Sequence, residues 1–113
     1  MIDQVQPAQL PDWMTAQAAH GATVVLDVRE VWEVETACVK AQGFDLLKIP
    51  MHTIPARLQE LNREQPIACL CHHGARSMQV AAFLVQQGFS HVANITGGIH
   101  AWSSQVDATV PTY

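Results

Sequence analysis

One short segment of the chain gathers several side chains that could do chemistry. Residues 71–77 read Cys-His-His-Gly-Ala-Arg-Ser, so a potential nucleophile and two imidazoles stand within a few residues of a guanidinium group. A cysteine thiolate is a strong nucleophile, and arginine is a permanent cation that binds anions. The apolar run 67–70 precedes the segment and an apolar-periodic stretch follows Ser77. This order predicts a strand, a reactive loop and a helix.

The loop is expected to hold an anion. Backbone N–H groups in such a loop and in the first helical turn lack intrahelical acceptors and can converge on one point. Cys71 should stand at the rim of this ring, where the positive end of the helix dipole favours a thiolate. We therefore expect Cys71 to be the catalytic residue. The expected substrate-binding residues are His72, His73, Gly74, Ala75, Arg76 and Ser77.

The other cysteines are expected to be structural. Cys69 should point into the packing of the sheet, and Cys38 lies in a stretch with no clear pattern. A zinc site built from Cys69, Cys71 and the two histidines is the minor alternative, because such sites usually join two separated ligand pairs. A dithiol redox site is also disfavoured, since two residues lie between the cysteines of a thioredoxin-like motif, whereas only Leu70 lies between Cys69 and Cys71.

The elements that must position this loop follow an alternating pattern. Apolar runs predict strands over about 23–28, 45–50, 67–70 and 91–95, and helical periodicity or capping signals predict helices over about 7–20, 53–62, 77–87 and 99–105. Strands separated by helices pair in parallel, so the fold class is α/β, with a mainly parallel sheet of four or five strands. The fifth strand would include Gln4 and Val5. Ligands bind beyond the carboxyl ends of such strands, where Cys71 is expected.

Composition narrows the classes of protein. With 113 residues and 49% hydrophobic residues, the chain is expected to be a single domain spanning 1–113. A net charge of −4 disfavours nucleic acid as a partner, and the longest apolar run, 80–85, is too short to span a membrane. The N-terminal residues lack the features of an export signal, and the cysteine count of three is odd. We therefore expect a cytoplasmic protein without a disulfide framework.

Four motifs in order resemble one family. They are Asp27–Glu33 (DVREVWE), Ile49-Pro50 with Pro55–Leu58 (PARL), the Cys71 loop, and Gly97–Trp102 (GGIHAW). Together they resemble the rhodanese family of sulfurtransferases, which implies a rhodanese-like single domain. Segment 36–44 departs from the family's usual sequence. We expect Asp27 and Arg29 to brace neighbouring loops and the paired glycines to form a tight turn.

The resemblance implies a mechanism. Cys71 would take the outer sulfur from a small sulfur-containing anion, such as thiosulfate or a persulfide, and hold it as a persulfide. The acceptor would be a thiol, cyanide or a sulfur-carrier protein, and neither a metal nor an organic cofactor would be required. His72 and His73, standing where some members carry fixed positive charges, are expected to tune the pH profile and donor preference.

Two other functions use the same loop. The first is a non-enzymatic sulfur carrier or sensor, which would exchange sulfur only within a protein complex. The second is an arsenate- or phosphate-processing enzyme. Relatives with phosphatase activity have one more residue between the cysteine and the arginine, whereas four residues separate Cys71 from Arg76. By that comparison, the loop length favours sulfur over phosphate.

Overall fold

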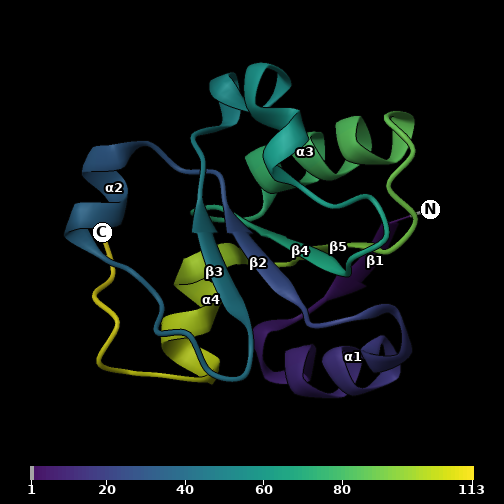
Figure 1. Ribbon diagram of the computed structural model, residues 1–113. Coiled ribbons are helices and arrows are strands. Elements are labelled where there is room, and N and C mark those ends of the chain that lie inside the picture. The colour runs from purple at the N-terminus through teal and green to yellow at the C-terminus, as the bar shows by residue number, and fades with distance from the viewer. Residues whose placement is uncertain (1) are drawn as a thin grey trace.

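A sheet of five parallel strands forms the centre of the protein in a computed structural model that describes residues 2–113 (Figure 1). The strand order is β1-β5-β4-β2-β3, and every neighbouring pair is parallel. The strands are β1 (Ile2–Val5), β2 (Val24–Asp27), β3 (Asp45–Lys48), β4 (Ile67–Leu70) and β5 (Val92–Ile95). This confirms the predicted α/β class and the fifth edge strand. Because the sheet is parallel, the carboxyl ends of all five strands lie at the same end of the sheet.

Helices cover both faces of the sheet and make one compact α/β domain. Figure 1 shows α3 (Ala75–Gln86) on one face and α1 (Leu10–Ala16) with α4 (Gly98–Gln105) on the other. The short helix α2 (Val31–Thr36) lies near the C-terminal end of the chain. The 3₁₀ turns are η1 (Pro7–Gln9), η2 (Ala18–His20), η3 (Met51–Thr53) and η4 (Pro55–Glu60). Across residues 2–113, none of the helices has the length and apolar character needed to cross a bilayer.

The central strand β4 divides its side chains between two cores. Ala68 and Leu70 join the cluster under α1 and α4, whereas Ile67, Cys69 and Cys71 join the cluster under α3. This alternation is the period of two that a strand imposes on its side chains. Cys71 therefore continues the series that faces α3, even though it lies just beyond the strand.

Two predicted helices differ from the structure, and one helix of the structure was not predicted. The expected helix over 53–62 consists of 3₁₀ turns, with Arg57 outside helical geometry (φ −112°, ψ 15°). The expected helix over 7–20 is divided into η1, α1 and η2. The helix α2 was missed. It has only six residues, too few for periodicity to show, and its start depends on a capping box between Glu30 and Glu33.

The atypical segment 36–44 follows α2 and contributes to the core. Ala37, Val39 and Phe44 are buried in the cluster under α1 and α4. Cys38 lies between two of these residues, is partly buried, and its Sγ is 3.3 Å from the Val39 carbonyl oxygen. The segment therefore replaces the family's usual sequence with a packed connection from α2 to β3.

Candidate active site

The loop after β4 places the Cys71 sulfur at the N-terminus of α3. The Gly74 N–H donates to Cys71 Sγ at 3.0 Å, and Ser77 Oγ lies 3.3 Å from the same sulfur. Gly74 is the N-cap of α3, has a left-handed conformation (φ 107°) and supplies no side-chain cap. The amides of the first turn, residues 75–77, thus have no intrahelical acceptor. This end of α3 can stabilise negative charge on a sulfur atom.

The sulfur lies deeper than the sequence predicts. Cys71 was expected at the rim of the loop, but the residue is only 1% exposed and packs in the core under α3. The reason is that residue 71 still follows the side-chain alternation of β4. The reactive atom is therefore at the floor of the loop, with the loop backbone above it.

The N-terminus of α4 holds the loop from the other side. The Ile99 N–H donates to the Cys71 carbonyl at 2.8 Å, and the His100 N–H donates to the His72 carbonyl at 3.2 Å. In a trans peptide the C=O and N–H groups point in opposite directions, so the His72 and His73 amides turn away from α4. Gly98 permits this close approach, because a Cβ there would collide with both carbonyl oxygens. The glycine pair thus forms a tight turn against the loop.

Arg76 is occupied by an ion pair with α2. Its guanidinium donates to both carboxylate oxygens of Glu33, at 2.6 and 2.8 Å, and the Tyr113 hydroxyl donates to Glu33 at 2.8 Å. Glu33 is only 3% exposed, and the Arg76 guanidinium lowers its pKa to about 2. Arg76 therefore braces the loop against α2 in this structure.

A second, fully buried ion pair supports α2. Arg29 donates to both carboxylate oxygens of Asp27, at 2.9 and 2.7 Å, and also to the carbonyls of Glu33 and Ala37. It also donates to the Tyr113 hydroxyl at 3.0 Å. This is the bracing geometry expected for the Asp27 and Arg29 pair, and it ties the middle and the C-terminal end of α2 to the end of β2.

The two loop histidines belong to a row of neighbouring rings, in which His72 stacks on Tyr113 and the other pairs are tilted. His72 lies between Tyr113 and His73, with ring centroids 3.9 and 4.0 Å apart, and His73 lies 5.0 Å from His100. Burial lowers the pKa of His72, and the neighbouring His73 lowers it further. His72 is therefore a neutral ring at pH 7, and it does not supply a fixed positive charge to the loop.

The sulfur of Cys69 has different surroundings from that of Cys71. Cys69 is fully buried, and burial raises the pKa of its thiol to about 12. It therefore stays protonated, as expected of a structural cysteine. Within residues 2–113, no group of three or more His, Cys, Asp and Glu side chains is arranged to hold a metal ion.

Three residues near the loop were missed as site residues. Glu33 had a usable signal, because it ends the DVREVWE motif. Asn94 interrupts the apolar strand β5, and Tyr113 lies far from the loop in sequence. Neither Asn94 nor Tyr113 shows a spacing that would connect it to Cys71.

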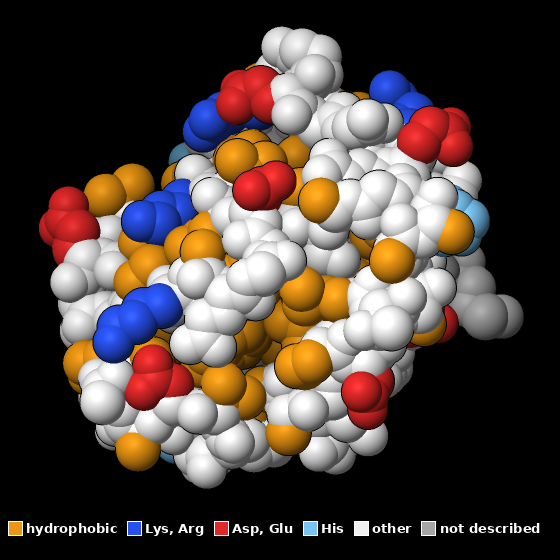
Figure 2. All heavy atoms as spheres, turned by 60° about the horizontal axis from the view of Figure 1, so that its bottom comes forward, with side chains coloured by type: hydrophobic (Ala, Val, Ile, Leu, Met, Phe, Trp, Pro, Cys, Tyr) orange, Lys and Arg blue, Asp and Glu red, His pale blue; other side chains and the backbone are white. Residues whose placement is uncertain are grey.

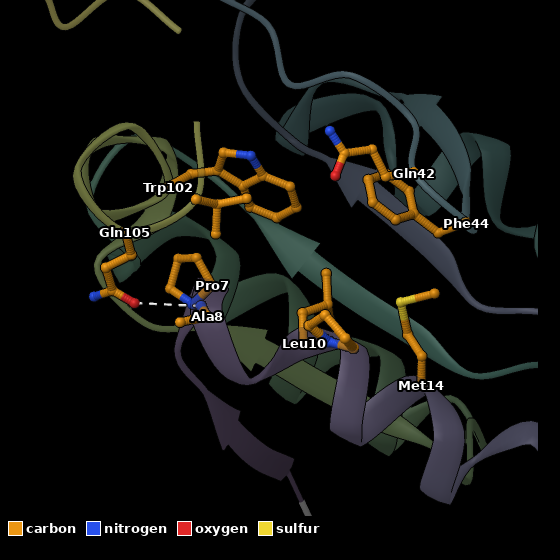
Figure 3. Close-up of a pocket in the computed structure, with 10 residues that line it drawn as sticks. Pro7, Ala8, Leu10, Met14, Gln42, Phe44, Trp102 and Gln105 are labelled. Atoms are coloured by element: carbon orange, nitrogen blue, oxygen red, sulfur yellow. Dashed lines mark hydrogen bonds between the residues drawn. The ribbon is translucent and has the colours of Figure 1, made fainter. Parts of the chain in front are cut away.

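A separate apolar hollow lies on the face that carries α1 and α4, where Figure 2 shows hydrophobic side chains gathered in a depression. Its volume is about 300 Å³. Figure 3 shows Leu10, Met14, Phe44 and Trp102 around it, with the Ala8 N–H donating to Gln105 Oε1 at 3.3 Å. Its lining has no cysteine, histidine or charged side chain. This hollow therefore offers neither a nucleophile nor a charged group for catalysis.

Comparisons with known proteins agree with this geometry. Residues 10–105 match the family model described as rhodanese-like domain. A protein named "Sulfurtransferase" from Allochromatium vinosum is 42% identical over 73 residues, covering 63% of this chain and 68% of that protein. A "Putative sulfur carrier protein" from Bacillus subtilis is 34% identical over 83 residues, covering 74% of this chain but only 43% of its own length.

A solved structure extends the likeness to the whole fold. The rhodanese-like domain protein from Staphylococcus aureus superposes with a TM-score of 0.74 at 25% sequence identity. The match covers 99% of both chains. The order of strands and helices around the Cys71 loop is therefore shared with a known domain of this type.

Proposed function

The chain belongs to the rhodanese-like domain family, and from this premise we propose that it is a sulfurtransferase that carries sulfur as a persulfide on Cys71. The observation that carries the proposal is the Gly74 N–H donating to Cys71 Sγ at 3.0 Å, beside the open amides of the first turn of α3. A ring of amide donors suits an anionic sulfur species, because hydrogen bonds to ionised acceptors are stronger than neutral ones.

The transfer takes place in two displacements. The Cys71 thiolate attacks the outer sulfur of a donor, the donor's sulfur–sulfur bond breaks, and the remainder of the donor leaves with the electron pair. With thiosulfate the leaving group is sulfite. The acceptor then attacks the outer sulfur of the Cys71 persulfide and regenerates the thiolate. Cyanide would become thiocyanate, and a thiol would become a persulfide. Neither displacement requires an external oxidant or reductant.

Backbone amides, more than side-chain charge, would hold the donor. The Arg76 charge is paired with Glu33, and the stacked His72 ring is neutral at pH 7. The donor is therefore a small sulfur-containing anion that accepts hydrogen bonds from residues 72–77. A persulfide donor needs fewer compensating cations than thiosulfate, whose charge is double.

A sulfur carrier is the second candidate, because one relative bears that name. A carrier would form the same Cys71 persulfide but pass it only to a protein partner. Turnover with cyanide or a small thiol distinguishes the two: rapid turnover indicates an enzyme, and loading without turnover indicates a carrier. The cytoplasmic location and the single domain over 1–113 remain predictions.

The deciding experiment measures the mass of the intact protein after exposure to thiosulfate and, separately, to an organic persulfide. We expect one added sulfur atom, located by peptide analysis on Cys71. Cys71→Ser should abolish both the adduct and sulfur transfer, whereas Cys69→Ser, the matched control, should retain most of the transfer. Equal losses in both variants would instead indicate a dithiol mechanism. Aryl-phosphate turnover that depends on Cys71 and exceeds sulfur transfer would overturn the proposal.

A further inference from the structure

A chain of neutral polar side chains runs beneath the Cys71 loop, from the edge of the sheet to the sulfur. Gln4 and Asn94 are register partners in β1 and β5, and Asn94 Nδ2 donates to Gln4 Oε1 at 3.1 Å. Ser77 Oγ lies 2.6 Å from Asn94 Oδ1 and 3.3 Å from Cys71 Sγ. Asn94 is 4% exposed in an otherwise apolar strand, and Ser77 is fully buried. Buried polar groups of this kind are costly unless they are paired.

Counting hydrogens shows which form of Cys71 this arrangement suits. The Ser77 hydroxyl has a single hydrogen and three acceptors nearby: Asn94 Oδ1 at 2.6 Å, the Gly74 carbonyl oxygen at 3.2 Å and Cys71 Sγ at 3.3 Å. The Asn94 oxygen is much the closest, so it takes the hydrogen. That hydrogen is therefore unavailable to the sulfur. The serine oxygen can still accept a hydrogen bond from a Cys71 S–H. This arrangement of hydrogen bonds therefore favours the protonated thiol of Cys71.

The same cavity accommodates the opposite arrangement. The oxygen and nitrogen ends of a carboxamide have nearly the same size, so the Asn94 amide can turn by about 180° within its space. Its Nδ2 would then donate to Ser77 Oγ. The serine hydrogen would be released from Asn94 and could turn to Cys71 Sγ. An ionised sulfur attracts that hydrogen more strongly than the neutral Gly74 carbonyl oxygen, which lies at a similar distance from Ser77 Oγ.

Gln4 decides how readily Asn94 turns. After the rotation Asn94 Oδ1 faces Gln4, which must present its own Nε2 as the donor. Gln4 is exposed, and its Nε2 now contacts only the Met78 thioether, at 3.1 Å. A thioether is a weak acceptor, so little is lost when Gln4 turns. The two amides can therefore reverse together.

We propose that Asn94 and Gln4 are positioning residues for Cys71, and that coupled rotation of their amides switches Ser77 from accepting to donating when Cys71 ionises. The same reversal places a donor beside the inner sulfur of a Cys71 persulfide. This second part rests on the proposed function. The first part concerns only the free cysteine, so it can be tested independently of sulfur transfer.

The test substitutes Gln4, the exposed end of this row of hydrogen-bonded side chains, so that the core stays intact. Gln4→Glu replaces a group that can donate or accept with a carboxylate that only accepts. It should hold Asn94 Nδ2 toward position 4 and Oδ1 toward Ser77. We expect the pH profile of Cys71 alkylation, followed on its own peptide by mass spectrometry, to move to higher pH. At pH 7 alkylation should slow about threefold, the equivalent of one ordinary hydrogen bond.

Controls separate this effect from simple charge repulsion. Gln79→Glu adds the same charge at an exposed position of α3 that has no part in the hydrogen bonds from Gln4 to Cys71. It should change the pH profile of Cys71 alkylation much less. In a Ser77→Ala background, Gln4→Glu should lose its effect, because the influence of Gln4 passes through the serine hydroxyl. Equal shifts for Gln4→Glu and Gln79→Glu would overturn the proposal, and so would a Gln4→Glu shift that persists without Ser77. Failure to load sulfur would contradict only the proposed function.

Discussion

Two adjacent residues of α3 support the Cys71 loop in opposite ways. Arg76 reaches outward to Glu33 of α2 and forms an ionic brace that continues through Tyr113 and Arg29. Ser77 points inward to a neutral chain of amides. The difference shows that the loop has one support with fixed donors and acceptors and another whose donors and acceptors can exchange roles.

The hydrogen-bond donors and acceptors of the ionic brace cannot exchange roles. An arginine only donates and an ionised carboxylate only accepts, so their polarity is set by their chemistry. Glu33 is ionised at every physiological pH, because the Arg76 guanidinium lowers its pKa to about 2. The brace therefore keeps the same donors and acceptors across the physiological pH range.

The largest predicted effect comes from disturbing the contact between the N-terminus of α4 and the Cys71 loop. Gly98→Ala would push a methyl group into the Cys71 and His72 carbonyls at a left-handed position (φ 60°). We expect a loss of about 3 kcal/mol in the free energy of unfolding, measured with urea, together with faster alkylation of Cys71 as the loop loosens.

Gly43→Ala is the matched control. Gly43 is also left-handed (φ 77°), but its added methyl group would meet only the flexible end of Met14, at 3.5 Å. The expected loss is about 1 kcal/mol, from backbone strain alone. Equal losses in the two variants would show that the contact between α4 and the loop is not what makes Gly98 necessary.

A smaller effect is predicted for breaking the ionic brace alone. Glu33→Gln should lower the free energy of unfolding by about 2 kcal/mol, since the Arg76 partner is about one-third exposed and partly solvated. Sulfur transfer should fall because Arg76 no longer fixes the loop. Glu60→Gln, which breaks the exposed pair with Arg57, should leave both properties unchanged.

The brace also predicts a dependence of stability on pH. The folded-state pKa of Glu33 is about 2, below its ordinary 4.5, so its contribution is complete above about pH 4.5 and disappears as the pH falls toward 2. Glu33→Gln should remove this part of the acid sensitivity. An unchanged acid profile in the variant would assign the sensitivity to other groups.

The smallest predicted effect concerns the stacked histidines. Burial lowers the pKa of His72, so this ring adds less positive charge to the loop near neutral pH than an unperturbed histidine would. Replacing both residues (His72→Asn with His73→Asn) should change thiosulfate turnover by about twofold, with the change confined to acid pH. A loss of similar size at pH 8 would mean that the rings act through stacking on Tyr113 and not through charge.

The sequence predicts the centre of the fold better than its edges. Strands such as 67–70 and 91–95 are identified by apolar runs, because buried parallel strands must be apolar on both faces. The helix α2 and the 3₁₀ turns at 51–60 are not, since they are short and depend on single caps and prolines. The depth of Cys71 was also not predicted, although the alternation along β4 already contains that information.

The supports of the loop are harder to predict than the loop itself. The reactive segment is contiguous, so its residue types can be read directly from the chain. Its partners come from position 4, position 33, position 94 and position 113, and only folding brings them together. Glu33 can be identified from its motif, whereas Gln4 looks like any surface glutamine of an edge strand.

The burial of Cys71 has a further consequence for what can reach it. Residue Cys71 is only 1% exposed. A reagent can therefore reach its sulfur only through a small opening or when the loop backbone moves. Slim molecules, such as a linear anion or a thiol on a flexible stem, pass such an opening more easily than bulky ones. If Cys71 carries sulfur as proposed, its burial would select acceptors and donors by size and would protect the bound sulfur from large reductants in the surrounding solution.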